Sequence, residues 1–304
     1  MTQTPIIGRF APTPSGPLHF GSLVTAVASY CHSKSQQGQW LLRIEDVDTP
    51  RVVKGATNQI LAALDAYGFE WDGEVIYQSN QFDYYRSKLS DLFKIKACFA
   101  CECTRRTLKD VNASNGLMGI IYPGSCRHKI LNSSNQSIRL NTESALSSSF
   151  NDSIYGHIEL NIKEQVGDFI LRRADGVYAY HLAVVVDDFL QNINQVVRGA
   201  DLLYSTCLHL LLQQYFNFPT PQFWHIPLIK NIDGQKLSKQ AGAVAIDNDK
   251  ASATLIAALK FLKQPVEEFE SLDKLPSEIL ELAVKHWAPD NIQPDNYEHQ
   301  TLPT

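Results

Sequence analysis

Short apolar runs alternate along the chain with longer segments in which apolar residues recur every three or four positions. Short apolar runs are typical of buried strands, whereas the longer spacing is typical of helices with one apolar face. We expect strands at residues 5–12, 39–48 and 223–229. We expect helices at residues 23–36, 57–69, 83–96 and 205–216. Because strands that alternate with helices favour a parallel sheet, the pattern predicts an α/β fold.

Residues 104–164 interrupt this alternation. The stretches NASNGLMG, LNSSNQS and ALSSSFNDS are rich in Asn and Ser, which favour turns and loops. The α/β pattern resumes at residues 168–190, and the chain has a helical pattern after about residue 240. We therefore predict an α/β domain at residues 1–95 and 165–240, an insertion at residues 96–164 and a helical C-terminal segment at residues 241–304.

The composition of the 304 residues, 44% hydrophobic and 19% charged, is that of an ordinary globular protein. The net charge of −5 excludes a protein that coats nucleic acid over its whole surface, so any RNA contact must be a local patch. The N-terminus lacks the basic and apolar pattern of a signal peptide, and no apolar run approaches ~18 residues. We expect a cytoplasmic protein with no membrane partner and, since no coiled-coil pattern is seen, a monomer.

The stretch RFAPTPSGPLHFGS, from Arg9 to Ser22, joins the first expected strand to the first expected helix. The free N–H groups at a helix N-terminus bind phosphate, and glycine lets a ligand approach the backbone. His19 adds a hydrogen-bond donor at the same place. Taken alone, the stretch fits a structural turn as well as it fits a phosphate site.

The segment DGQKLSKQ, residues 233–240, places Lys236 and Lys239 in a loop after an expected buried strand. A lone KLSK is typical of a solvated turn. The functional alternative is a pair of mobile cations that closes over a triphosphate, for which the compact charge of lysine on a flexible stem is suited.

Four of the six cysteines, Cys98, Cys101, Cys103 and Cys126, fall within one short region. In a reducing cytosol such a cluster favours a metal site over disulfides. From spacing alone, these four thiols make a common zinc ligand set. The other two, Cys31 and Cys207, stand in apolar helical segments and are expected to be inert core thiols.

Together the two loops resemble the paired signatures of class I aminoacyl-tRNA synthetases: PLHFGS is similar to HIGH, and KLSKQ is similar to KMSKS. The stretches GRFAPTPSGPLHFGSL, LLRIEDVDTPR, YAYHLAVVVDD, VVRGADLL and IPLIKNIDGQKLSK resemble glutamyl-tRNA synthetases over roughly residues 6–240. Only about 64 residues follow, too few for the anticodon-reading region of the full-length enzymes. With CECTR and YPGSCR, the chain resembles the glutamyl-queuosine tRNA(Asp) synthetase family.

This resemblance implies a Rossmann-type class I catalytic core, a zinc-binding insertion and a helical C-terminal segment. It implies activation of L-glutamate by ATP, with Mg²⁺, to glutamyl-adenylate without tRNA. Transfer of glutamate to queuosine at the wobble position of tRNA(Asp) would follow. Two alternatives remain: a truncated synthetase that charges a tRNA 3′ end, and a non-catalytic paralogue that binds RNA or glutamate.

The resemblance also implies roles for individual residues. The implied catalytic residues are His19 and Lys239. The implied glutamate site consists of Arg9, Ala11, Thr13, Glu45, Tyr180 and Arg198, with the arginines on a carboxylate and Glu45 on the ammonium. The implied ATP site consists of Pro12, His19, Gly21, Lys236 and Lys239.

The implied zinc ligands are Cys101, Cys103, Tyr122 and Cys126, so that Tyr122 and Cys98 compete for the fourth position. Arg105, Arg106 and Arg127, close to this cluster, are candidates for a local RNA-docking patch.

Overall fold

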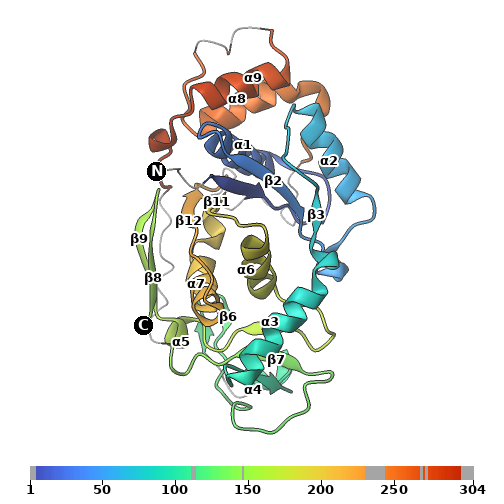
Figure 1. The fold of residues 1–304 in the computed structure, drawn as a ribbon, viewed down its shortest axis with the longest axis vertical. Helices are drawn as coiled ribbons and strands as arrows, with labels where there is room; N and C mark the ends of the chain where they lie inside the picture. The colour runs from blue at the N-terminus through green and yellow to red at the C-terminus, as the bar shows by residue number, and fades with distance from the viewer. Residues whose placement is uncertain are drawn as a thin grey trace.

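A parallel sheet forms the centre of the fold in the computed structural model, which describes residues 5–110, 114–145, 147–229, 244–267, 270 and 273–295. Its strands are β1 (Ile7–Phe10), β2 (Gln39–Ile44), β3 (Ile76–Tyr77), β11 (Gln195–Gly199) and β12 (Gln222–Ile226). β2 pairs in parallel with β1 and β3, and β11 pairs in parallel with β12. Because β11 lies beside β1, the strands follow the order β3-β2-β1-β11-β12 (Figure 1). The expected parallel α/β architecture is confirmed.

Helices cover both faces of this sheet. α1 (Phe20–Lys34) packs on β1, β2 and β11, and it is covered in turn by α8 (Ala251–Phe261) and α9 (Pro276–Lys285), at the top of Figure 1. α2 (Ala56–Ala66) packs into the same hydrophobic core as α1. The first hydrophobic core includes Leu23, Val27, Trp40, Leu42, Leu255, Leu259 and Ile279. α1 approaches β1 closely, since a Cβ on Gly8 would lie 2.1 Å from Ser33 Oγ.

A second core lies below the sheet in Figure 1. It is formed by α3 (Phe82–Lys94), α6 (Tyr180–Leu190) and α7 (Ser205–Phe216) with the antiparallel strands β4 (Cys98–Cys101), β7 (Ser137–Leu140) and β10 (Ile170–Arg172). The strand and helix expected at residues 168–190 are present as β10 and α6. However, β10 pairs with β7 rather than with the parallel sheet. The sequence could not predict this pairing, because a short apolar run does not specify which strand it will pair with.

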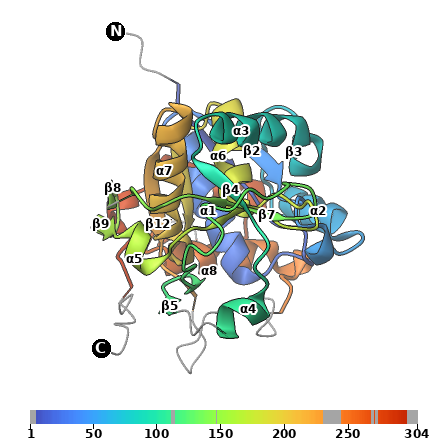
Figure 2. The ribbon, with the colours of Figure 1, turned by 90° about the horizontal axis from the view of Figure 1, so that it is seen from below.

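The region between β4 and β10 contains short elements. They are α4 (Arg105–Asp110), α5 (Ile162–Gln165), β5 (Asn115–Gly116), β6 (Gly119–Ile120), β8 (Ser148–Asp152) and β9 (Gly156–Leu160). The β8–β9 hairpin packs against α7 and β12, and Figures 1 and 2 both place it beside β12. This hairpin belongs by sequence to the predicted insertion, yet it contacts the parallel sheet. The predicted domain boundaries stay predictions.

Most element ends lie close to those expected. The helix expected at residues 205–216 coincides with α7, whereas the strand expected at residues 39–48 stops at Ile44 and leaves Glu45 in a loop. Short 3₁₀ helices occur at Thr49–Arg51, Gln78–Asn80, Ala200–Leu202, Asn248–Lys250 and Pro289–Asn291. Within the described ranges, no helix is both long enough and apolar enough to cross a membrane.

Candidate active site

A cavity of about 600 Å³ opens at the carboxyl ends of β1, β2, β11 and β12. Open parallel sheets bind ligands at this edge, where the strand order changes direction, which in this chain is between β1 and β11. The cavity brings together these predicted site residues: Arg9, Ala11, Thr13, His19, Gly21, Glu45, Tyr180 and Arg198. Pro12 is not in the lining, but its carbonyl accepts a hydrogen bond from Glu45 N at 3.0 Å and so joins the loops after β1 and β2.

Further cavity residues were not predicted from the sequence. They include Ser22, Thr25, Arg51, His181, Asp201 and Ser205. Arg51 stands in LLRIEDVDTPR, one of the stretches that carry the resemblance, so that motif contained a signal for it. A smaller adjoining cavity of about 190 Å³ shares Thr13, Glu45, Arg51 and Tyr180 with the large one.

Arg198, near the end of β11, is a buried cation with neutral partners. Its side chain donates to His225 Nε2 at 3.1 Å, Tyr180 Oη at 3.2 Å and Thr206 Oγ1 at 2.7 Å. Among the described residues, no carboxylate lies within 4.0 Å of it, although Arg198 is only 4% exposed. A buried charge is costly unless it is paired, so this position favours a ligand that brings a carboxylate.

Histidines next to Arg198 stay neutral. Burial, with a smaller contribution from the charge of Arg198, lowers the pKa of His181 to about 4. Burial also lowers the pKa of His225 to about 4, against the opposing effect of its hydrogen bond to Asp152. Burial likewise holds the pKa of His209 well below its usual range. Neutral imidazoles accept hydrogen bonds from Arg198 without repelling it, so the positive charge remains concentrated on one guanidinium.

Glu45 lines the same cavity and belongs to an ionic network. Asp188 Oδ1 accepts from Arg9 Nε at 3.1 Å and from Arg43 Nη2 at 2.7 Å, and Arg43 Nη2 is 3.7 Å from Glu45 Oε1. Burial alone would raise the pKa of Asp188, but Arg9 and Arg43 hold it below its usual range. Burial raises the pKa of Glu45 to about 7, against the opposing effect of Arg43 and Arg9. Glu45 is thus a carboxylate that a ligand cation would stabilise.

His19 is the N-cap of α1. Its Nδ1 accepts from Ser22 N at 3.3 Å, and its Nε2 lies 3.1 Å from Ser22 Oγ. The first turn of this 15-residue helix carries no acidic residue, so its N-terminal N–H groups remain suited to a phosphate. The predicted lysines Lys236 and Lys239 lie outside the described residues.

A thiol cluster lies in the region between β4 and β10. The sulfurs of Cys101, Cys103 and Cys126 lie within 4.8 Å of one another. Cys103 Sγ is 3.6 Å from Cys126 Sγ and 3.7 Å from Tyr122 Oη. Ligands on a tetrahedral zinc with bonds of about 2.3 Å lie roughly 3.8 Å apart, so three thiols and the phenol fit this ion. Arg139 Nε donates to Cys101 Sγ at 3.4 Å.

Cys98 does not join this cluster. Cys98 and Cys101 are three residues apart on β4, so their side chains leave opposite faces of the strand. Cys98 packs in the second hydrophobic core, where burial raises its pKa to about 12. The geometry therefore favours Tyr122 over Cys98 as a fourth ligand. As expected, Cys31 and Cys207 are fully buried core thiols.

The three arginines expected in an RNA patch differ in exposure. Arg105 and Arg106 are exposed on α4. Arg127 instead donates to Asp168 at 2.7 Å and is largely covered. Its charge is used inside the fold, which leaves Arg105 and Arg106 as the surface cations of this group.

Comparisons with known proteins agree with the motifs. Residues 5–262 match the family described as tRNA synthetases class I (E and Q), catalytic domain. The chain is 44% identical over 293 residues to a glutamyl-Q tRNA(Asp) synthetase of Dechloromonas aromatica (strain RCB). This match covers 95% of this chain and 96% of the relative. Identity to the glutamyl-Q tRNA(Asp) synthetase of Serratia proteamaculans (strain 568) is 43%, over 96% of this chain and 93% of the relative.

The fold has also been seen before. The crystal structure of a glutamate-tRNA synthetase from Elizabethkingia anophelis superposes with a TM-score of 0.79 at 23% identity, covering 95% of this chain and 67% of that one. At that identity the match shows the class I fold alone. Family membership follows from the sequence matches, which span nearly the whole chain: it belongs to the class I (E and Q) tRNA synthetases and, within them, to the glutamyl-Q tRNA(Asp) synthetase family.

Proposed function

We propose that this protein activates L-glutamate with ATP and then transfers the glutamyl group to queuosine in tRNA(Asp). The observation that supports the proposal is that one cavity contains two buried groups of opposite charge, each of which a ligand of the other charge would stabilise. Arg198 is a buried cation with no carboxylate within 4.0 Å among the described residues, and Glu45 is a buried carboxylate whose charge a cation would stabilise. Glutamate supplies a partner for each of them, since it carries two carboxylates and an ammonium group.

In the activation step, the α-carboxylate of glutamate attacks the α-phosphorus of ATP. An oxygen–phosphorus bond forms to give glutamyl-adenylate, and pyrophosphate leaves with the electron pair of the broken bond. The protein contributes positioning and charge rather than covalent chemistry. Arg9 and Arg198 would hold a glutamate carboxylate, and Glu45 would hold the ammonium. His19 and the N-terminus of α1 would face the phosphates, which carry Mg²⁺, while Lys239 is proposed to stabilise the departing pyrophosphate.

In the transfer step, a hydroxyl of the acceptor attacks the carbonyl of the adenylate, and AMP leaves. The smaller cavity adjoins the glutamate site along Thr13, Glu45, Arg51 and Tyr180, and so offers an approach for the acceptor. Sequence-specific RNA recognition favours unstacked bases in loops, and the wobble base lies in such a loop. Arg105 and Arg106 are candidate phosphate contacts. The expected monomeric state and cytoplasmic location stay predictions.

Labelled glutamate distinguishes this function from its alternatives. ATP–pyrophosphate exchange should depend on glutamate and proceed without tRNA. Label should then appear on tRNA(Asp) that contains queuosine, and enzymatic trimming of the tRNA 3′ end should leave the transfer intact. The matched control is tRNA(Asp) that lacks queuosine, which should accept no label.

Transfer that survives the loss of queuosine and disappears with the trimmed 3′ end would instead indicate a synthetase that charges the 3′ end. Absence of glutamate-dependent exchange in metal-replete protein would favour the non-catalytic alternative.

We also propose that Cys101, Cys103, Tyr122 and Cys126 hold a structural zinc ion. When bound, the ion would supply a tetrahedral anchor for loops that contain few apolar residues. Cys126 N–H donates to Tyr122 Oη at 2.8 Å, which orients the phenol toward the thiols.

Two single substitutions distinguish the fourth ligand. The purified protein should contain about one zinc per chain, and Tyr122→Phe should weaken zinc binding at least about tenfold in competition with a chelator. Cys98→Ser, the matched control, should leave zinc affinity unchanged because Cys98 lies in the hydrophobic core. The reverse pattern would identify Cys98 as the ligand.

A further inference from the structure

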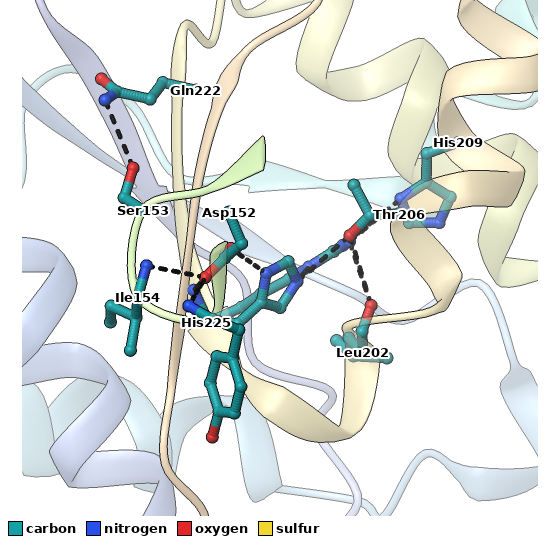
Figure 3. A network of polar contacts seen from close by, with 10 residues as sticks. Asp152, Ser153, Ile154, Leu202, Thr206, His209, Gln222 and His225 are labelled. Atoms are coloured by element: carbon teal, nitrogen blue, oxygen red, sulfur yellow. Dashed lines mark hydrogen bonds and ion pairs between the residues drawn. The ribbon is translucent and has the colours of Figure 1, made fainter. Parts of the chain in front are cut away.

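A buried chain of polar contacts leads from the β8–β9 hairpin to Arg198. Figure 3 shows its members Asp152, His225 and Thr206. The chain begins at Asp152, the last residue of β8, whose side chain is fully buried. Asp152 Oδ2 lies 2.6 Å from Nδ1 of His225, on β12. His225 Nε2 then accepts from Arg198 Nε at 3.1 Å. The chain thus joins residues that are 73 and 27 positions apart in the sequence.

The other contacts of Asp152 fix the direction of these bonds. Its Oδ1 accepts from the backbone N–H groups of Ile154 and Tyr155, each at 2.9 Å, and its Oδ2 also accepts from His225 N at 3.2 Å. A carboxylate surrounded by N–H donors acts only as an acceptor. His225 must therefore carry its proton on Nδ1, and its Nε2 presents a lone pair to Arg198.

Thr206 completes the same arrangement. Its hydroxyl accepts from Arg198 Nη2 at 2.7 Å and lies 3.2 Å from His225 Nε2 and 3.4 Å from the carbonyl of Leu202. Asp152, His225 and Thr206 are all buried, so water does not compete for these bonds. The orientation of the guanidinium consequently depends on which nitrogen of His225 carries the proton.

We propose that Asp152 is a positioning residue for glutamate: by fixing the tautomer of His225, it holds Arg198 in the orientation that receives the substrate carboxylate. This inference rests on the proposed function. It assigns to the β8–β9 hairpin, which belongs by sequence to the predicted insertion, a part in the amino-acid site. Asp152 acts through His225 and Arg198 and does not itself touch the substrate.

Asp152 also has a structural role, which any test must distinguish from its positioning role. Its Oδ1 closes the tight turn after β8 through Ile154 and Tyr155, so a substitution can destabilise the hairpin without any effect on Arg198. The structural role affects the unfolding temperature. The positioning role affects the KM for glutamate and the proton position on His225.

Asp152→Asn keeps the size of the side chain but leaves one acceptor oxygen. When that oxygen accepts from the N–H groups of the turn, the amide NH₂ faces Nδ1 of His225. The ring proton then moves to Nε2, where it faces the N–H of Arg198 and leaves that donor without an acceptor. We expect the KM for glutamate in pyrophosphate exchange to rise about tenfold, as for one buried donor left without an acceptor, while the KM for ATP stays within about twofold. ¹⁵N NMR of the histidines should show His225 protonated on Nδ1 in the wild type and on Nε2 in the variant.

His225→Phe provides the second arm of a double-mutant cycle. Without the imidazole, Asp152 has no route to Arg198, so adding Asp152→Asn should raise the KM for glutamate no further. Additive effects on this KM would overturn the proposal. Ser153→Ala is the matched control in the same turn. Among the described residues, Ser153 Oγ contacts only Gln222, at 3.4 Å, so this variant should have an unchanged KM for glutamate.

The NMR measurement does not require an active variant, so it decides the case if His225→Phe fails to fold. Wild-type His225 protonated on Nε2 would overturn the proposal directly. Normal wild-type exchange with an unchanged KM in Asp152→Asn would overturn the positioning role alone. Wild-type exchange that does not depend on glutamate would overturn the proposed function and, with it, the role of Asp152 in that function.

Discussion

Replacement of Arg198 by alanine should raise the KM for glutamate at least about 30-fold, with little change in the KM for ATP. Truncating one member of a desolvated charge pair costs roughly 2–5 kcal/mol, which corresponds to about 30-fold to several thousand-fold in affinity. The pair in question would form between the substrate carboxylate and Arg198, which is 4% exposed and has only neutral hydrogen-bond partners in the described structure. The effect falls on glutamate because Arg198 is proposed to hold its carboxylate, whereas the phosphates of ATP are proposed to face His19 and the N-terminus of α1.

Two variants accompany this measurement of pyrophosphate exchange. Arg198→Lys keeps the charge but loses the planar fork, so its KM for glutamate should fall between those of the wild type and the alanine variant. Arg86→Ala makes the same truncation on the exposed surface of α3, where the side chain is 73% exposed, and should change neither KM. A glutamate dependence unaffected by Arg198→Ala would remove Arg198 from the amino-acid site.

The second large effect is a dependence on pH that comes from Glu45. Burial raises the pKa of Glu45 to about 7, and only the ionised carboxylate can pair with the ammonium of glutamate. Above pH 7 the group is charged and binding is at its strongest. As the pH falls below 7, the protonated fraction grows, so kcat/KM for glutamate should fall about tenfold for each further pH unit, because this parameter follows the ionisation of the free enzyme.

Glu45→Gln identifies the source of that dependence. The amide does not titrate, so the variant should show a low kcat/KM with the step near pH 7 removed. Burial also raises the pKa of Asp187 to about 6, and a residual step near pH 6 in the variant would belong to that neighbour. An unchanged step near pH 7 in Glu45→Gln would show that another group controls glutamate binding.

Local features of this protein could be predicted from its sequence. The limits of α7 follow from the spacing of its apolar residues, and the loop between β1 and α1 follows from its prolines and glycines, which exclude a regular element. Arg9, Glu45 and Arg198 were assigned from family motifs, and the structure places all three on one cavity. Each of these features depends on residues that are close together in the chain or on a long motif.

The network that supports the site could not be predicted in this way. Arg9 contacts Asp188 across 179 positions, and His225 stands in an apolar run that predicts only a buried strand. Periodicity reports which face of an element is buried, but it does not report which distant polar group faces it. The antiparallel pairing of β10 could not be predicted for the same reason, since a strand of three residues with two apolar side chains fits many partners.

One helix, α6, contributes two residues to the proposed amino-acid site and its supporting network. Its first residue, Tyr180, lines the cavity, and Asp188, near its other end, holds Arg9 and Arg43. Each residue added to or removed from a helix rotates all that follows by about 100°. A change of length between Tyr180 and Asp188 would therefore separate the cavity wall from the carboxylate that holds Arg9. During evolution, insertions and deletions should be purged from this stretch and accumulate in exposed turns such as residues 132–135.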